Sequence, residues 1–399
     1  MTSVILPTYN RSKISFVRGS GSWLESIEGN RYLDFGSGIA VNCLGHSHPK
    51  LINALNKQSK KLWHTSNIFN IPMQEELAQL LVNKTFADNV FFTNSGTESI
   101  ECAIKMARKH YFDMGHPKKN RIITFEGAFH GRSMAAVSAV VPMMKSNSSS
   151  RLTDGFAPLL GGFDRVPLGD YQKVEEAVSD NTCAIMIEPI QGEGGINVVP
   201  REFLFFLRTL CTQNDMQLIF DEIQCGIGRS GKFFVHQVYG VKPDIVAVAK
   251  GLGGGFPIGC CLATNSASSG MTSGTHGSTY GGNPLGCAVG LAVLKEIFSK
   301  GFLSDVRRKS SWLESALQKL LSKHKNIFED IRGLGLMLGI KCKIDNAKVI
   351  EKALEKYLIL IPASDNTIRI LPPLNVNKED LREGIARLFA TAEDLERGK

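Results

Sequence analysis

The chain has 399 residues, 43% of them hydrophobic and 21% charged, which is typical of a globular protein with a large core and room for a smaller one. The net charge of +8 comes from 46 basic and 38 acidic residues that are scattered along the chain. Because the densest basic clusters contain no interleaved aromatic residues, we expect no nucleic-acid binding, whereas anionic small substrates suit the mild positive charge.

The N-terminal residues lack a basic segment followed by a long apolar run, so no secretory signal is predicted. No apolar run reaches the roughly 18 residues of a membrane-spanning helix. The nine cysteines form no C-x-x-C pair and mostly lie in apolar surroundings. This pattern predicts buried, reduced thiols, and we therefore expect a cytoplasmic protein without a membrane partner.

Alternation of short apolar runs and helical patterns begins after two strand-like segments at residues 22–27 and 31–35. Strands are predicted at 90–93, 121–125, 183–187, 217–220 and 245–249, with helices between them such as 94–108 and 203–211. Near-continuous apolar strands separated by helices predict a parallel sheet covered on both faces. The Ser-rich segment 146–150 predicts a surface loop.

Beyond about residue 296 the pattern changes. Two amphipathic helices, at about 303–323 and 347–357, flank a short strand at 336–341, and another strand at 367–371 ends at two prolines. This arrangement predicts a separate small α+β domain over residues 296–399. We expect residues 1–45 to pack with it and residues 46–295 to form the large domain.

Three charged residues stand at consecutive strand ends of the predicted sheet: Glu188, Asp221 and Lys250. Chemistry in open parallel sheets gathers at the carboxyl edge of the strands, so we expect one shared site. Lys250 follows an apolar run and opens a Gly-rich loop, and burial there would lower its pKa. A neutral amine in such a place can attack an aldehyde and hold it as a Schiff base.

Asp221 needs a cationic partner if it is buried. Its 29-residue separation from Lys250 spans about one strand–helix–strand unit. The spacing leaves two interpretations open. Asp221 forms a structural salt bridge with Lys250, or a protonated ring nitrogen of a ligand lies between them.

A phosphate site is predicted at the motif Asn-Ser-Gly-Thr-Glu-Ser, residues 94–99, which opens a helix after a strand. Gly96 permits close approach, Ser95 and Thr97 offer hydroxyl groups, and the N–H groups at a helix start favour a phosphate. The same residues fit a capping box, with Ser95 as N-cap and Glu98 three positions later. Both interpretations can hold together.

The glycine-framed loop at residues 126–132 places Phe129 where it can stack on a planar ligand and Arg132 where it can clamp a carboxylate. A core aromatic and a surface arginine explain these two residues equally well. His130 fits a structural hydrogen-bonding role. His46 and His48 lack nearby carboxylates or cysteines, so no metal site is expected.

Residues 226–232, Gly-Ile-Gly-Arg-Ser-Gly-Lys, nearly match the nucleotide-binding P-loop pattern. The next residue is Phe233, so the hydroxyl group that would bind Mg²⁺ is missing. A P-loop nucleotide-binding protein therefore stays a minor alternative of a different class.

Six motifs together resemble the class III pyridoxal-phosphate aminotransferases, in order and over almost the whole chain; they lie at residues 94–98, 126–132, 188–195, 220–224, 249–255 and 277–284. The resemblance implies the transferase fold type I, with a large domain built on a mostly parallel seven-stranded sheet and a smaller α+β domain formed by the two chain ends. The family pattern also contains the Gly-rich stretch at 226–232, which removes the P-loop ambiguity.

The resemblance also implies roles around a pyridoxal 5'-phosphate cofactor. Lys250 would bind the cofactor aldehyde and move the substrate proton, while Asp221 would pair with the ring nitrogen. The remaining cofactor contacts would be Gln224 beside the phenolic oxygen, Phe129 on the ring, Ser95, Gly96 and Thr97 at the phosphate, and Thr279 from a neighbouring subunit. The last contact implies a homodimer with shared active sites.

For the substrates, the resemblance implies that Arg369 binds the α-carboxylate of glutamate or 2-oxoglutarate and pairs with Glu193 when an ω-amino donor is present. Arg132 would bind the α-carboxylate of that donor, and Ser278 is placed with the substrate-binding residues. Such clamps argue against a protein that only binds the cofactor. Departures from the family pattern occur at Ser99-Ile100 and Leu371; they leave the implied mechanism intact and bear only on the inference of fine specificity.

Residues 37–49 and 65–70 resemble the acetylornithine branch of the family. The implied reaction transfers the δ-amino group of N2-acetyl-L-ornithine to 2-oxoglutarate, giving N-acetylglutamate 5-semialdehyde and glutamate, a step of arginine biosynthesis. Succinylornithine, succinyl-diaminopimelate, ornithine and 4-aminobutyrate remain alternative donors.

Overall fold

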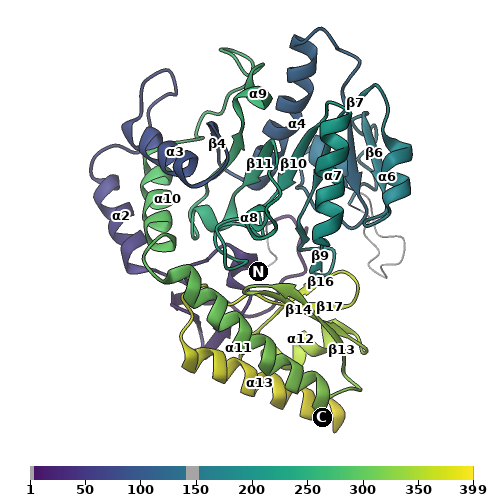
Figure 1. Ribbon diagram of the computed structural model, residues 1–399. Coiled ribbons are helices and arrows are strands. Elements are labelled where there is room, and N and C mark those ends of the chain that lie inside the picture. Colours follow the sequence, from purple (N-terminus) through teal and green to yellow (C-terminus); the bar gives the residue numbers. More distant parts are fainter. Residues whose placement is uncertain (1–3, 141–151, 399) are drawn as a thin grey trace.

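A seven-stranded sheet forms the centre of the larger part of the molecule (Figure 1). The computed structural model describes residues 4–140 and 152–398, so the surface loop predicted at 146–150 lies outside the described residues. In sheet order the strands are β4 (Asn89–Thr93), β12 (Gly259–Ala263), β11 (Ile245–Val248), β10 (Gln217–Asp221), β7 (Thr182–Ile187), β5 (Arg121–Phe125) and β6 (Phe163–Val166).

One strand runs against the others. β12 pairs antiparallel with both β11 and β4, whereas the pairs among β11, β10, β7, β5 and β6 are parallel. The mostly parallel seven-stranded sheet is therefore confirmed, and the wholly parallel sheet inferred from the alternation of strands and helices is wrong at β12. The physical reason is the short connection from β11 to β12, which has no room for the crossover that parallel neighbours require.

Both faces of this sheet are buried. On one face Ile219 belongs to a hydrophobic cluster with residues of α4 (Gly96–Asp113). On the other face Leu218 and Phe220 join a cluster with residues of α7 (Arg201–Gln213). Burial on both sides explains why the strands are almost continuously apolar, and it directs their polar residues to the strand ends.

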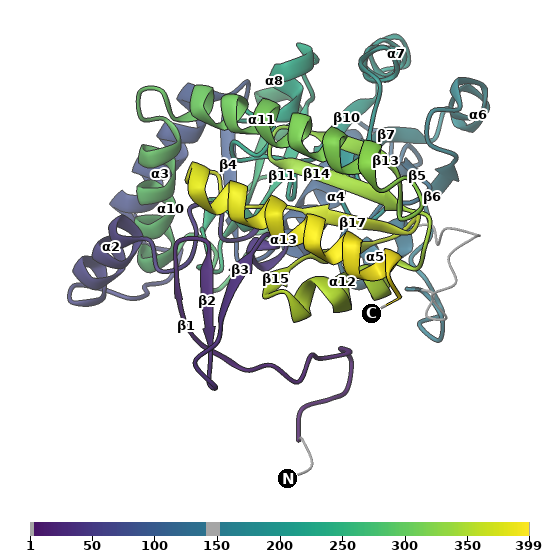
Figure 2. The same ribbon diagram turned by 90° about the horizontal axis from the view of Figure 1, so that it is seen from below.

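The two chain ends build the smaller part of the molecule (Figure 2). A four-stranded sheet has the order β13 (Phe328–Leu334), β14 (Met337–Cys342), β17 (Thr367–Ile370), β16 (Ile361–Ala363). The helices α11 (Phe302–Lys323), α12 (Asn346–Glu355) and α13 (Lys378–Glu396) accompany it. The N-terminal strands β1 (Phe16–Ser20), β2 (Trp23–Ser26) and β3 (Arg31–Asp34) form another sheet, in which β3 pairs with β15 (Leu358–Ile359).

The remaining elements connect these sheets. They are α1 (Ser37–Ala40), α2 (Pro49–Ser59), α3 (Pro72–Lys84), α5 (Met134–Ala139), α6 (Tyr171–Ala177), β8 (Ile190–Gln191), β9 (Asn197–Val198), α8 (Val235–Tyr239), η1 (Lys250–Leu252), α9 (Asn265–Ser268) and α10 (Pro284–Ile297). The predicted strands at 22–27, 31–35, 336–341 and 367–371 and the helices at 303–323 and 347–357 are present, with ends shifted by up to two residues.

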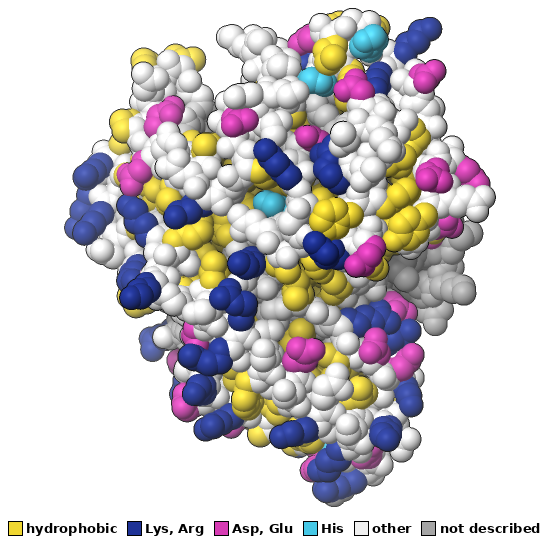
Figure 3. Space-filling view, viewed as in Figure 1, with side chains coloured by type: hydrophobic (Ala, Val, Ile, Leu, Met, Phe, Trp, Pro, Cys, Tyr) yellow, Lys and Arg dark blue, Asp and Glu magenta, His cyan; other side chains and the backbone are white. Residues whose placement is uncertain are grey.

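On the face shown in Figure 3, basic side chains are spread over the whole surface and interspersed with acidic and hydrophobic ones. Across the described chain, every helix is too short or too polar to span a bilayer. All nine cysteines are free and buried, as predicted.

Candidate active site

A cavity of about 350 Å³ opens at the carboxyl ends of β7, β10 and β11. Its walls come from several loops that follow strands of the large sheet. They are lined by Val41, Asn94, Ser95, Gly96, Thr97, Phe129, His130, Gly131, Glu188, Asp221, Ile223, Gln224, Ala249, Lys250, Gly255, Phe256, Pro257 and Ile258. The sheet edge thus brings the predicted trio Glu188, Asp221 and Lys250 together.

Lys250 begins the short helix η1 directly after β11, and its backbone has a positive φ of 43°. Residues other than glycine rarely adopt this backbone conformation. It persists where the surrounding structure stabilises it, and it is frequent at functional sites. Burial lowers the pKa of the Lys250 amine, with Arg369 acting in the same direction, while Glu193, Asp221 and Glu188 oppose it. In the described chain the amine has no hydrogen-bond or ion-pair partner, so it is free to react.

Asp221 is held by neighbours other than Lys250. Its Oδ2 lies 2.8 Å from Nδ1 of His130, and its Oδ1 accepts a hydrogen bond from the Ile223 N–H at 3.0 Å. A direct Asp221–Lys250 salt bridge, one of the two interpretations left open above, does not form among the described residues. The two side chains instead share the walls of one cavity, which leaves space for a ligand between them.

His130 and Glu188 are buried titratable groups close to this carboxylate. Burial opposes protonation of His130, but the hydrogen bond and charge of Asp221, together with Glu188, raise its pKa. Burial and the Asp221 charge raise the pKa of Glu188 to about 8, against the opposing effects of His130 and two backbone N–H groups. Those N–H groups belong to Phe129, at 2.9 Å, and Gly192, at 3.3 Å. Glu188 therefore supports the cavity loop that contains Phe129 and the β8–β9 connection that contains Gly192.

The start of α4 forms another wall. Ser95 caps the helix by accepting from the Glu98 N–H, while the Glu98 carboxylate accepts from the Asn94 N–H, one residue before the position a capping box requires. A Cβ on Gly96 would meet Ile223 at 3.0 Å. The hydroxyl of Thr97 accepts from the N–H groups of the loop residues 132 and 133. The helix start is thus both capped and part of the cavity wall.

Phe129 is partly buried and lines the cavity, whereas Arg132 is exposed and lies outside its lining. The Arg132 guanidinium lies over the Phe129 ring, 5.3 Å from its centre. A cation in this position attracts the ring electrostatically. The contact places a cationic group, without an ion-pair partner among the described residues, beside a residue that lines the cavity.

Arg369, on β17, is buried, and its two terminal nitrogens bind both carboxylate oxygens of Glu193 at 2.6 and 3.0 Å. The same guanidinium donates to Oε1 of Gln224 at 3.1 Å. Since Gln224 lines the cavity, this bond connects the Glu193–Arg369 pair to the cavity wall. Bidentate pairs of this kind are among the strongest charge-assisted contacts.

Ser278 and Thr279 lie elsewhere. They line a second hollow of about 330 Å³, together with Glu98 and Tyr280. Asn94 lines both spaces and donates to the Ser278 hydroxyl at 3.2 Å. Thr279 is exposed, so this chain by itself does not bring it to the cavity.

The P-loop-like segment 226–232 has a structural role. Arg229 is buried and donates to the carbonyls of Leu336 and Pro372, at 3.1 and 2.5 Å. The helix that follows, α8, has its first N–H groups bonded to the Glu222 carboxylate. Those donors are therefore occupied, and the segment is not arranged to cradle a phosphate.

Several residues that line or support the cavity were not predicted from the sequence. Val41, Phe256 and Pro257 line the cavity from segments without any polar signal. The Gln224–Arg369 bond joins residues far apart in the chain, and no pattern marks it. His46 pairs with Asp34 at 2.7 Å, and the described residues contain no group of three or more side chains suited to a metal ion.

Comparison with known proteins now adds to the geometry. Residues 6–391 match the family model described as aminotransferase class-III. The acetylornithine aminotransferase of Rhodobacter capsulatus is 52% identical over 99% of both chains. The enzyme of the same name from Clostridium acetobutylicum is 44% identical over 96% of this chain and 97% of its own.

Two solved structures are also similar. The ornithine aminotransferase of Toxoplasma gondii has a TM-score of 0.94 and 29% identity, covering 99% of this chain and 94% of its own. The N-acetylornithine aminotransferase of Stenotrophomonas maltophilia has a TM-score of 0.85 and 35% identity, covering 98% of both chains.

Proposed function

This chain belongs to the class III aminotransferases and is a pyridoxal-phosphate-dependent transaminase, and on that premise we propose the reaction it catalyses. The enzyme transfers the δ-amino group of N2-acetyl-L-ornithine to 2-oxoglutarate, giving N-acetylglutamate 5-semialdehyde and glutamate. Relatives named acetylornithine aminotransferase, at 46–52% identity, support this choice. The Glu193–Arg369 pair is the single structural observation that carries the use of an ω-amino donor together with 2-oxoglutarate.

The cavity fits the cofactor on its own chemistry. The capped start of α4 supplies N–H groups for a phosphate, and Phe129 provides a ring face. Asp221 offers a buried carboxylate to a ring nitrogen, and Lys250 offers an amine of lowered pKa. When bound, pyridoxal phosphate supplies an aldehyde and a ring that withdraws electrons from the substrate carbon.

The chain's own residues then have separate tasks in this proposal. Lys250 is the catalytic base: its uncharged amine accepts the proton from the substrate carbon and would deliver it to the cofactor. Asp221 keeps a positive charge at the ring nitrogen, and His130 orients Asp221 through the 2.8 Å contact. Gln224, Ser95, Gly96, Thr97 and Phe129 hold the cofactor in place.

The Glu193–Arg369 pair explains how one cavity accepts two kinds of donor. Glutamate brings an α-carboxylate next to its reacting carbon, and Arg369 can bind it once Glu193 moves away. An ω-amino donor has no carboxylate there, so a buried Arg369 needs Glu193 as its counter-ion. Arg132, whose guanidinium lies over the cavity-lining Phe129, is then left for the distant α-carboxylate of the donor. Ser278 lines the second hollow in this chain and stays part of the proposal as a further substrate-binding residue.

Two further assignments belong to the proposal. Thr279 completes the phosphate site of a second copy of the chain, so the enzyme is a homodimer with shared active sites; its exposure in this chain supports the idea. The cytoplasm is the proposed location, because nine free, buried thiols suit a reducing compartment.

A donor panel tests the function. Steady-state kcat/KM is measured with N-acetylornithine, succinylornithine, succinyl-diaminopimelate, ornithine and 4-aminobutyrate, each with 2-oxoglutarate as acceptor. We expect N-acetylornithine to have the highest value. A clear preference for free ornithine would overturn the assignment and leave another ω-aminotransferase of the same family.

A further inference from the structure

Glu193 lies at the tip of a very short hairpin. Its strands, β8 and β9, have two residues each, with Gln191 opposite Asn197. Isolated two-stranded hairpins are at best marginally stable, and glycines flank Glu193 on both sides. The place of the Glu193 carboxylate therefore depends on contacts that reach the hairpin from outside.

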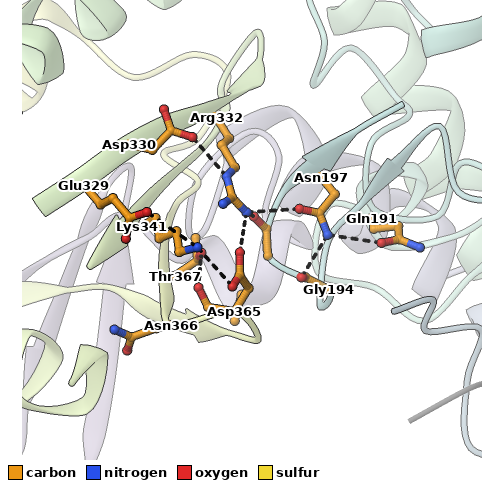
Figure 4. A network of polar contacts seen from close by, with 12 residues as sticks. Gln191, Gly194, Asn197, Glu329, Asp330, Arg332, Lys341, Asp365, Asn366 and Thr367 are labelled. Carbon is orange, nitrogen blue, oxygen red and sulfur yellow. Dashed lines mark hydrogen bonds and ion pairs between the residues drawn. The ribbon is translucent and has the colours of Figure 1, made fainter. Parts of the chain in front are cut away.

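Arg332, on β13, provides such contacts (Figure 4). Its Nη1 lies 3.1 Å from Oδ1 of Asn197, 3.5 Å from the Gly195 carbonyl and 2.8 Å from Oδ2 of Asp365. The side-chain amide of Asn197 in turn donates to the Gly194 carbonyl at 3.0 Å and to Gln191 at 3.2 Å. The Arg332 guanidinium thus binds both β9, through Asn197, and the tip of the hairpin, through Gly195.

The tip is also fixed from two further sides. The Ser364 N–H donates to the Glu193 carbonyl at 2.9 Å, and Ser364 precedes the same Asp365 that binds Arg332. On the cavity side, a Cβ on Gly192 would lie 2.4 Å from Gln224. The backbone of Glu193 is therefore wedged between the cavity wall and the turn at residues 364–366.

From these contacts we propose that Arg332 is a positioning residue for the Glu193–Arg369 pair. It holds the hairpin backbone still, so that Glu193 closes on Arg369 or releases it by rotation of its side chain alone. Arg332 touches neither substrate nor Arg369 in this account. The inference rests on the proposed function, because it assigns a residue that sets the balance between the two kinds of donor.

The consequence is a population shift. A loosened hairpin weakens the closed pair, which leaves Arg369 without its counter-ion when an ω-amino donor is bound. The same loosening frees Arg369 for a dicarboxylate, which otherwise has to displace Glu193. Apparent affinity scales with the fraction of the protein in the binding-competent state. One substitution at Arg332 should therefore weaken the reaction with ω-amino donors and strengthen the binding of dicarboxylates.

The test uses Arg332→Met in the holoenzyme. We expect kcat/KM for the preferred ω-amino donor to fall relative to that for glutamate, by about fivefold in the ratio. Isothermal titration with glutarate, which carries neither an amino nor a keto group, should show binding tighter by a similar factor. A variant that is merely damaged cannot gain affinity, so this second measurement separates positioning from loss of structure.

Arg121→Met is the matched control. Arg121 is also a strand arginine that binds an aspartate, Asp164, but the pair lies at the β5–β6 edge of the large sheet. Arg121→Met should leave unchanged both the ratio of kcat/KM between the ω-amino donor and glutamate and the affinity for glutarate. Asn197→Ala, a milder change, should act in the same direction as Arg332→Met, and the effects of the two should not add if they act through one contact.

Either outcome can be read separately from the proposed function. If the wild-type donor panel shows no preferred ω-amino donor, that result refutes the proposed function and says nothing against the contacts of Arg332. If the wild type does prefer one, an unchanged donor ratio and unchanged glutarate affinity in both Arg332→Met and Asn197→Ala would refute the positioning role.

Discussion

Lys250 combines burial with an unusual backbone conformation and an unpartnered amine in the described chain. Lys250→Ala should lower turnover by roughly 10²–10⁴-fold or more, since it removes the proposed base as well as the anchor. Borohydride reduction of the wild-type holoenzyme followed by peptide mass analysis should label Lys250. The exposed Lys232 is a matched control, and Lys232→Ala should keep turnover. Labelling at a different lysine would disprove the assignment.

Glu188 predicts a pH-dependent effect on stability. Its pKa is raised to about 8 in the folded protein from an ordinary value of 4.5, so the folded state binds the extra proton between these values. Stability from this group is then complete below its unfolded pKa and is lost as pH rises through 8. Glu188→Gln cannot ionise, so its unfolding free energy relative to wild type should increase from pH 5 to pH 8.

Urea unfolding at several pH values measures this difference. The change has a fixed cost as well, because glutamine offers one acceptor oxygen to the two N–H groups of Phe129 and Gly192. That cost is the same at every pH. A difference between variant and wild type that stays constant from pH 5 to pH 8 would show that Glu188 is already ionised in the folded protein.

At the level of elements, the start of α4 has two functions that can be separated. Ser95→Ala removes the cap and should lower the unfolding free energy by about 1 kcal/mol, and it should also weaken cofactor binding, because the cap shapes the cavity wall. Asn377 caps α13 in the same way, accepting from the Asp380 N–H. Asn377→Ala should lower stability similarly and leave cofactor affinity, measured by equilibrium dialysis, unchanged.

The elements also show what the sequence could predict. The apolar runs that became β7, β10 and β11 were recognisable because both faces of each strand are buried, and this placed Glu188, Asp221 and Lys250 at one edge. The direction of β12 was not recognisable, since pairing direction depends on the connection and not on the strand's own residues. Asp221 pairs with His130 and not with Lys250. This pairing could not be predicted, because it depends on how the loop that carries His130 packs against the end of β10.

The whole molecule raises the question of how its parts act together. β3 pairs with β15, and Arg229 reaches from the large part to carbonyls of the C-terminal segment. The β3–β15 pairing supports the proposed division into residues 1–45, 46–295 and 296–399, with the first packing on the third, whereas the Arg229 contacts connect the second to the third. The Arg369 strand belongs to the C-terminal part and the Lys250 cavity to the central part, so the proposed substrate switch spans both.

Shared active sites make a prediction for the complete assembly. If each site takes Lys250 from one copy and Thr279 from the other, Lys250→Ala and Thr279→Asp should each give an inactive homodimer, the second because the new carboxylate repels a phosphate. A hybrid dimer places both defects in one site and leaves the other site intact. Random mixing makes about half of the dimers hybrids with one working site each, so activity should recover to roughly one quarter of the wild-type value.

The measurement is turnover after the two inactive variants are mixed, unfolded and refolded together, with each variant refolded alone as the control. Recovery requires that intact Lys250 and intact Thr279 meet across a subunit boundary, because neither chain carries both. The exposure of Thr279 and its place outside the Lys250 cavity of its own chain are the reasons to expect this. Mixtures that stay as inactive as the separate variants, although they sediment as dimers, would mean that each chain completes its own site.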